Sequence, residues 1–168
     1  MQLQLLPFAL AALAASIALV TDLRTRRIPN WLTFATLIVG VVANIYINGA
    51  AGGAQAGLGA LVGFGALIPF YAVRAVGAGD VKLLAAIGAL VGPAGLLPVA
   101  VYGGAVGGAM SLVLLAKHRR LTFTLQQVLV MRGMPARSGI KAPYAVAIAG
   151  GVYLALVPGL SGFLLGGA

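Results

Sequence analysis

Acidic residues are almost missing from this sequence. Among its 168 residues only Asp22 and Asp80 carry a carboxylate, against eleven Lys and Arg. Cysteine is absent, which excludes disulfides and thiolate metal sites. The single histidine, His118, lies in a basic loop, and one histidine with two aspartates makes a poor set of metal ligands. No serine stands in a recognisable nucleophile motif, so we expect no metal, no cofactor and no serine or cysteine chemistry.

Charge of either sign is also scarce. Charged residues make up 8% of the chain and hydrophobic residues 61%, whereas soluble domains carry about 25% charged residues. The stretches without any charge are 1–21, 28–73, 83–116 and 142–168. Since a membrane span needs about 20 apolar residues and satisfies its backbone within a helix, we expect an all-α polytopic membrane protein with about six transmembrane helices. No internal repeat is visible, so residues 1–168 are expected to form a single membrane-embedded domain.

The expected helices follow from the interruptions between the apolar stretches. We place them at about 3–21, 30–48 and 55–73, two within 81–116, and the last at about 142–164. The turn inside 81–116 falls at Gly92-Pro93 or nearer Pro98. The first choice leaves a helix of about 18 Å, which is shorter than the membrane core of about 30 Å. Residues 49–54 are expected to form a flexible linker, and residues 121–131 a short helix on the membrane surface.

Basic residues are distributed unevenly between the two sides of this predicted bundle. The loops 22–29, 74–80 and 117–141, with their edges, hold all eleven of them, and the opposite loops, 49–54 and 92–98, hold none. The positive-inside rule then places the basic loops in the cytoplasm and both chain ends outside it. This topology explains the net charge of +9 without a nucleic-acid partner. Because basic residues follow the first apolar segment and none precedes it, we expect a retained helix there rather than a signal peptide.

Glycine is abundant, with 25 residues. The pairs Gly59/Gly63 and Gly104/Gly108 have the spacing that lets membrane helices approach one another closely. We interpret both pairs as helix contacts rather than as functional sites.

The two aspartates are expected on the same side of the membrane. A helical hairpin separates them, so Asp22, after the first helix, and Asp80, before the fourth, both reach the cytoplasmic face. Taken singly, Asp22 could form a surface ion pair with the neighbouring arginines, and Asp80 could be the N-cap of a helix. An ionisable group near a membrane helix is costly. A chain that retains only these two acids, at one face, therefore favours their use as a pair.

Two close carboxyl groups suit hydrolysis. Like charges in a low-dielectric site do not both ionise readily, so the pair would share one proton. The ionised partner would take a proton from water, while the protonated partner polarises the scissile carbonyl and later protonates the leaving amine. Gly77 and Gly79 would let an extended peptide approach Asp80 and would allow unusual backbone dihedrals.

The residues around both aspartates resemble a known family. Asp22 is followed by Ile28-Pro29-Asn30, and Asp80 lies in Gly77-Ala78-Gly79-Asp80-Val81-Lys82, before Leu83. This pattern is similar to the type 4 prepilin peptidases, which are membrane aspartyl proteases with a GxGD signature. The segment Lys141-Ala142-Pro143-Tyr144, before the last expected helix, resembles a further feature of that family. The resemblance covers essentially the whole chain.

The resemblance implies an aspartic endopeptidase that cuts the short leader from prepilins or pseudopilins at the cytoplasmic face of the bacterial inner membrane. Asp22 and Asp80 would be the catalytic pair. Supporting or substrate-binding roles would fall to Gly77, Gly79, Lys82, Pro29 and Asn30. Larger members carry an added part with paired CxxC zinc motifs linked to N-methylation, so this cysteine-free chain is expected to lack methyltransferase activity. Its compact size resembles the versions that serve Flp-type, tight-adherence pili, which implies small Flp pilins as substrates and pilus or secretion machinery as a partner.

Other functions stay open from the residues alone. A small transporter or channel could use Asp80 in an ion path, since intramembrane acids often serve that role. A non-catalytic membrane subunit of a secretion system would need neither aspartate. Lys82 also has several expected roles: it could pair with Asp80 or with an acidic residue of the substrate, or extend to the membrane interface.

Overall fold

The computed structural model describes residues 2–117 and 144–157. This part of the chain consists of the helices α1 (Gln2–Thr25), α2 (Asn30–Ala72), α3 (Ala78–Lys117) and α5 (Tyr144–Ala155). The first three are long and apolar enough to cross a membrane. The expectation of an all-α, membrane-type protein is therefore confirmed, whereas the six spans and the side of the chain ends stay predictions. The expected surface helix 121–131 and His118 lie outside the described residues.

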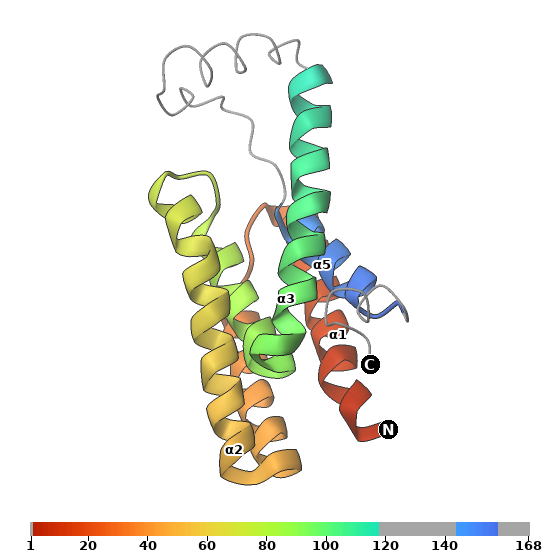
Figure 1. Ribbon diagram of the computed structural model, residues 1–168. Coiled ribbons are helices and arrows are strands. Elements are labelled where there is room, and N and C mark those ends of the chain that lie inside the picture. Colours follow the sequence, from red (N-terminus) through yellow and green to blue (C-terminus); the bar gives the residue numbers. More distant parts are fainter. Residues whose placement is uncertain (1, 118–143, 158–168) are drawn as a thin grey trace.

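Each of the two longest helices is interrupted at one glycine. Gly49 (φ 61°, ψ −145°) interrupts α2, and Gly92 (φ 72°, ψ 175°) interrupts α3. A positive φ is strained for residues with a side chain, so glycine suits both positions. Figure 1 shows the result: the chain reverses direction at each break, and the second half of α2 runs beside the first half of α3.

The breaks sharpen one predicted boundary and correct two others. The turn within 81–116 lies at Gly92, the first of the two alternatives, so the part of α3 before it is a short helix (residues 78–91) of about 21 Å. The predicted linker 49–54 is wrong, because only Gly49 leaves the helical conformation. The predicted end of the first helix near residue 21 is also wrong, because α1 continues to Thr25 and so includes Asp22.

Glycines bring the backbones of α2 and the short helix 78–91 into direct contact. Gly59 and Gly88 face each other so closely that a Cβ on either would collide with the carbonyl group of the other. A Cβ on Gly63 would lie 2.5 Å from the carbonyl oxygen of Leu84. The interpretation of Gly59/Gly63 as a helix contact is therefore confirmed.

The second predicted glycine contact is wrong by one residue. A Cβ on Gly104 or Gly108 would meet nothing within 4 Å. Gly103 instead faces α5, where its Cβ would lie 3.1 Å from the carbonyl oxygen of Ala147. The small-residue spacing was recognised correctly in this part of α3, but the helix presents the other side to its neighbour.

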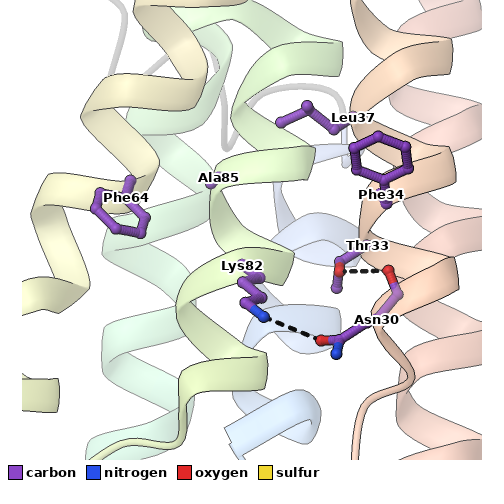
Figure 2. A pocket seen from close by; sticks show the side chains of 7 residues that line it. All are labelled: Asn30, Thr33, Phe34, Leu37, Phe64, Lys82 and Ala85. Atoms are coloured by element: carbon purple, nitrogen blue, oxygen red, sulfur yellow. Dashed lines mark hydrogen bonds between the residues drawn. The ribbon is translucent and has the colours of Figure 1, made fainter.

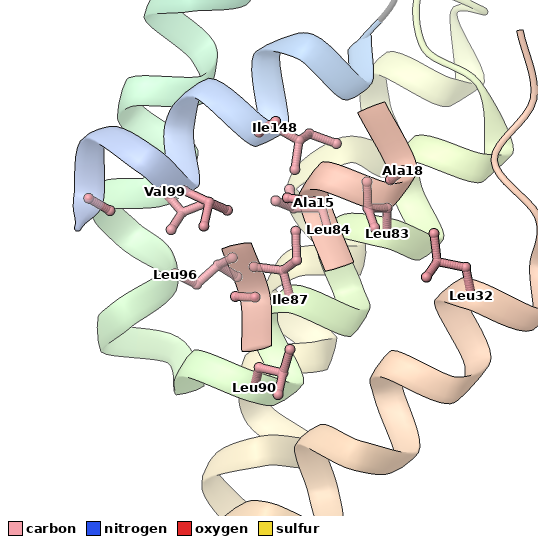
Figure 3. Close-up of a cluster of buried hydrophobic side chains, with 14 residues drawn as sticks. Ala15, Ala18, Leu32, Leu83, Leu84, Ile87, Leu90, Leu96, Val99 and Ile148 are labelled. Carbon is pink, nitrogen blue, oxygen red and sulfur yellow. The ribbon is translucent and has the colours of Figure 1, made fainter. Parts of the chain in front are cut away.

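The hydrophobic core lies where the short helix 78–91 meets α1 and α5 (Figure 3). Leu83, Ile87 and Leu90 of the short helix are at most 1% exposed. The buried residues that α1 contributes to this core are the small Ala11, Ala15 and Ala18. Small side chains on α1 and glycines on α2 let three elements pack closely around the short helix, which fixes the helix that carries Asp80.

A buried asparagine closes the break in α3. The break at Gly92 leaves carbonyl groups at the end of the short helix without their helical partners. The side-chain amide of Asn44, in the first half of α2, donates to the carbonyl oxygens of Ala89 (3.0 Å) and Leu90 (2.9 Å), and also to that of Gly40 (2.9 Å). Backbone groups freed in this way must find partners when no water is present, so Asn44 makes a broken helix tolerable inside a membrane.

Candidate active site

Asp22 lies in the last turn of α1 and is half-buried. The backbone N–H of Ala145, in the first turn of α5, and the positive charge of Arg26 are both near enough to act on this carboxylate. Within the described ranges Asp22 forms no direct ion pair, so the alternative of a simple surface ion pair is not what the structure contains. The contact with Ala145 brings a third helix to this carboxylate.

Asp80 is the third residue of α3 and is also half-buried. Its carboxylate Oδ2 accepts a hydrogen bond from the backbone N–H of Gly77, at 3.1 Å. This reach back to the residue before the helix is the arrangement of a capping box, in which the cap residue is Gly77 and not Asp80. The expected N-cap role of Asp80 is therefore corrected: the side chain does close the helix start, but from inside the first turn. An acidic residue there also interacts favourably with the helix dipole.

The fold brings the two carboxyl groups together. Asp22 is close enough to Asp80 for its charge to act on that side chain. They come from different helices and are the only acidic residues of the chain. Among the residues that the structure describes, no group of three or more His, Cys, Asp and Glu gathers in one place. The site therefore offers two interacting carboxyl groups at the ends of two helices, which is a set of groups suited to moving protons.

The glycines before Asp80 serve close packing. A Cβ on Gly79 would lie 3.1 Å from the Cβ of Ile28, in the loop between α1 and α2. A Cβ on Gly77 would lie 3.1 Å from Oδ2 of Asp80. Neither glycine has a positive φ, so the expectation of unusual dihedrals at these positions is wrong. Their absent side chains instead let the two sequence motifs, one around each aspartate, touch each other.

The residue after Ile28 sets the start of α2. Pro29 stands at the N-cap position with extended backbone (φ −65°, ψ 136°), and its carbonyl oxygen accepts hydrogen bonds from the backbone N–H groups of Leu32 (3.2 Å) and Thr33 (3.4 Å). It precedes the first helical residue, Asn30. The fixed φ of proline thus directs the chain from the Gly79 contact into α2.

The Lys82 side chain faces α2 and not the two aspartates. Its Nζ donates a hydrogen bond to Oδ1 of Asn30 at 3.1 Å, as Figure 2 shows. Among the described residues Lys82 forms no ion pair, so the expected pairing with Asp80 does not occur. Residues two positions apart in a helix point to different sides, which explains why Lys82 and Asp80 serve different surroundings.

A groove of about 450 Å³ opens between α2 and α3 beside this hydrogen bond. We call it the α2–α3 groove; its lining residues are Asn30, Thr33, Phe34, Leu37, Phe64, Lys82 and Ala85. Figure 2 shows the polar side chains of Asn30 and Lys82 at one end and the aromatic and aliphatic side chains along the rest. The groove is therefore amphipathic, and its polar end lies next to the segments that carry the motifs.

Sequence reasoning missed two contributors to the site. The backbone N–H of Ala145 at Asp22 was signalled only by the segment 141–144, of which residues 141–143 lie outside the described part. Asn44, which caps the far end of the short helix 78–91, carried no motif. The one sequence signal for Asn44 was the presence of a polar amide within a long apolar stretch.

The comparisons with known proteins identify the chain at the level of its family. No curated protein and no solved structure matches it. The model of the type IV leader peptidase family matches residues 9–112. This range includes Asp22, Ile28-Pro29-Asn30 and Gly77–Lys82, the residues whose contacts have just been described. The chain therefore belongs to the type IV leader peptidase family.

Proposed function

We propose that this protein is a membrane aspartic endopeptidase that removes the short leader peptide from prepilins or pseudopilins. Asp22 and Asp80 are its catalytic pair, and the cleavage takes place at the cytoplasmic face of the bacterial inner membrane. One observation carries the proposal: the only two acidic residues of the chain come from different helices and interact with each other. Membership of the leader peptidase family supplies the reaction class.

The proposed chemistry needs one proton shared between the two carboxyl groups. Repulsion between like charges favours the state with one ionised and one protonated partner. The ionised carboxylate takes a proton from the attacking water, and the protonated partner donates to the scissile carbonyl oxygen. As the tetrahedral intermediate collapses, the carboxyl group that took the water proton passes it to the leaving amine. The hydroxyl formed from the carbonyl oxygen returns its proton to the other carboxylate, so the pair again holds one proton. Gly77 and Gly79 support this chemistry by keeping Asp80 in its capping contact and the Ile28 loop in place.

The test is to replace each carboxyl group by the amide of the same shape. Asp22→Asn and Asp80→Asn are compared with the wild-type chain for processing of a co-expressed Flp-type prepilin, read as a mobility shift on a gel. We expect each variant to lose at least about 1,000-fold in cleavage rate, because an amide cannot transfer the proton. Processing at the wild-type rate by either variant would end the two-aspartate proposal. Thermal unfolding of each variant shows that the loss is chemical and not a failure to fold.

Metal removal provides a separate test of the chemistry. Two carboxyl groups that activate water directly need no bound ion, so cleavage in detergent should continue in the presence of EDTA. A clear loss of cleavage after EDTA, restored by added divalent cations, would contradict the metal-free mechanism.

Small Flp pilins are the substrates that we propose, by the resemblance to the peptidases of Flp-type pili; N-methyltransferase activity is not part of the proposal. The six-span topology of a single domain, with both chain ends outside the cytoplasm, is part of the same proposal. Single cysteines introduced at residues 50 and 74 should react with a membrane-impermeant reagent from opposite sides of the membrane. Labelling of both from the same side would overturn this topology.

A further inference from the structure

The polar end of the α2–α3 groove presents hydrogen-bond donors of Lys82 and Asn30. Lys82 carries three N–H donors and no acceptor. One of these donors is used on Oδ1 of Asn30, which is the only side-chain acceptor of that residue. The hydroxyl of Thr33, which also lines the groove, donates to the backbone carbonyl oxygen of Asn30 at 3.0 Å. Among the described residues, the donors that remain for a ligand at this end are those of Lys82 and the amide nitrogen of Asn30, while the oxygens of Thr33 and Asn30 can still accept.

Lys82 also decides which way the Asn30 amide points. A lysine cannot accept a hydrogen bond, so the oxygen of the amide must turn toward it and the nitrogen must turn away. Figure 2 shows this arrangement, with Nδ2 of Asn30 on the side opposite to the hydrogen bond with Lys82. Among the described residues Nδ2 has no hydrogen-bond partner. The pair therefore holds a neutral donor and a cation ready for an oxygen acceptor.

The Asn30–Lys82 pair lies near the two aspartates but forms no hydrogen bond or ion pair with them. Gly79 and Lys82 lie three residues apart on the same side of α3, and Gly79 packs against Ile28, two residues before Asn30. Asp80, two residues before Lys82, lies on another side of the helix and is within reach of the charge of Asp22. The donor pair thus flanks the reacting groups, and the apolar walls of Phe34, Leu37 and Phe64 lead away from it.

We propose that the Asn30–Lys82 pair is a substrate-binding subsite, in which both side chains donate to an oxygen acceptor of the peptide being cleaved while apolar side chains of that peptide occupy the α2–α3 groove. The occupant is a peptide segment because the polar end of the groove adjoins both motif segments and apolar side chains line the rest of it. Asn30 binds the acceptor, and Lys82 both binds it and orients Asn30. This subsite rests on the proposed endopeptidase function.

The experiment uses the full chain in nanodiscs of uncharged lipid, with a purified Flp-type prepilin as the probe. Lys82→Met, Asn30→Ala and the double variant are compared by kcat and KM. We expect each single variant to raise KM about tenfold with kcat within about twofold of wild type, because the pair binds the substrate and takes no part in the proton transfer. The double variant should be little worse than Lys82→Met, because loss of Lys82 already releases the Asn30 amide. Lys82→Arg, which keeps a cationic donor, should restore most of the affinity.

Control variants keep the result specific. Lys117→Met makes the same chemical change at an exposed position in the last turn of α3 and should leave kcat and KM unchanged. An unchanged KM in both Lys82→Met and Asn30→Ala would overturn the subsite. So would a fall in kcat that follows a fall in melting temperature, which would indicate a structural role, or a KM effect seen only in nanodiscs with anionic lipid, which would indicate a lipid site. If Asp80→Asn still cleaves, the proposed function fails as well; if it does not, only the subsite has failed.

Discussion

The two ends of the short helix 78–91 solve the same structural problem with different chemistry. At its start, the carboxylate of Asp80 accepts a hydrogen bond from the backbone N–H of Gly77. At its end, the amide of Asn44 donates to the carbonyl oxygens of Ala89 and Leu90. Both contacts satisfy backbone groups that a helix end leaves free. One end uses a charged group supplied by the helix itself, and the other a neutral group supplied by a neighbour.

The two ends differ in how many polar atoms of the capping side chain remain available after the backbone groups have been bonded. Asn44 is 8% exposed, and its amide nitrogen donates to three carbonyl oxygens, so both of its N–H donors are used on the backbone. Asp80 uses only one of its two oxygens on Gly77 and lies half-buried beside Asp22. A carboxylate that caps with one oxygen keeps the other for proton transfer. We therefore expect changes at the start of the helix to affect cleavage and changes at its end to affect stability.

The largest effect is expected from a side chain added at the start of the helix. In Gly79→Val the new Cβ would lie 3.1 Å from that of Ile28, so the Ile28 loop, which follows the helix that carries Asp22, would be displaced. A displacement of about 1 Å at a site of this kind costs about 100-fold in rate. Prepilin processing by Gly79→Val should fall by at least about that factor, while its melting temperature stays near that of wild type.

The matched control for this variant is Gly65→Val, at a position of α2 where a Cβ would meet nothing within 4 Å. It should cleave at the wild-type rate. Equal loss in both variants would show that valine in a helix, and not the contact with Ile28, is responsible.

The next effect is expected at the other end. Asn44→Leu removes the amide and leaves the carbonyl groups of Ala89 and Leu90 buried without that partner. We expect a loss of about 2 kcal/mol in the free energy of unfolding, since each unsatisfied buried group costs about 1–3 kcal/mol and relaxation recovers part of it. Denaturant titration in detergent measures this loss. Asn48→Leu, at an exposed position one turn further along α2, is the control. If Asn44→Leu lost cleavage at unchanged stability, the division between the two ends would be wrong.

A smaller effect is expected beyond the break, where α3 meets α5. Gly103→Leu would press on the carbonyl oxygen of Ala147, whereas Gly104→Leu adds a side chain where a Cβ meets nothing within 4 Å. Overpacking of a close helix contact costs about 1–3 kcal/mol, so we expect Gly103→Leu to be less stable than Gly104→Leu by about 1.5 kcal/mol. Thermal unfolding of the two variants side by side cancels the common change in helix propensity. Equal melting temperatures would place the helix contact elsewhere.

The sequence was sufficient for the features that depend on chemistry or on distance along the chain. Two acids in a membrane protein are few enough to suggest use as a pair, and the hairpin between them predicted that both lie on the same face. Gly92-Pro93 was identified as one of two possible turns, because glycine and proline both disfavour a continuous helix. The family resemblance rested on the same residues, and the family match confirms it.

The sequence could not predict which face of each helix contacts its neighbour. Gly103 and Gly104 begin pairs with the same spacing, and only packing against α5 decides which pair faces it. Asn44 bonds to residues 45 and 46 positions away, and no local pattern predicts such a partner. The sequence left three alternatives for Lys82, namely Asp80, an acidic residue of the substrate and the membrane interface. In the structure it bonds to Asn30, which was none of these.

The smallest effect is expected from a hydrogen bond that belongs to neither end of the short helix. Ser16 of α1 donates to the carbonyl oxygen of Ala12 at 2.6 Å, so the hydroxyl of Tyr153, in α5, is the donor of the 2.5 Å hydrogen bond between Tyr153 and Ser16. Tyr153→Phe removes that donor alone. Interhelical hydrogen bonds in membrane proteins contribute about 0.6 kcal/mol on average, so we expect a loss of about that size and normal cleavage.

Tyr46→Phe is the control for this change, because Tyr46 is 88% exposed and has no hydrogen bond among the described residues. Tyr153→Phe tests whether α5 acts on the site only through its first turn, where the backbone N–H of Ala145 is near the Asp22 carboxylate. Loss of more than about tenfold in cleavage, with a stability loss of only about 0.6 kcal/mol, would mean that the whole of α5 positions Asp22. The start of the short helix would then share its functional role with a helix from the other end of the chain, and the contrast between its two ends would be incomplete.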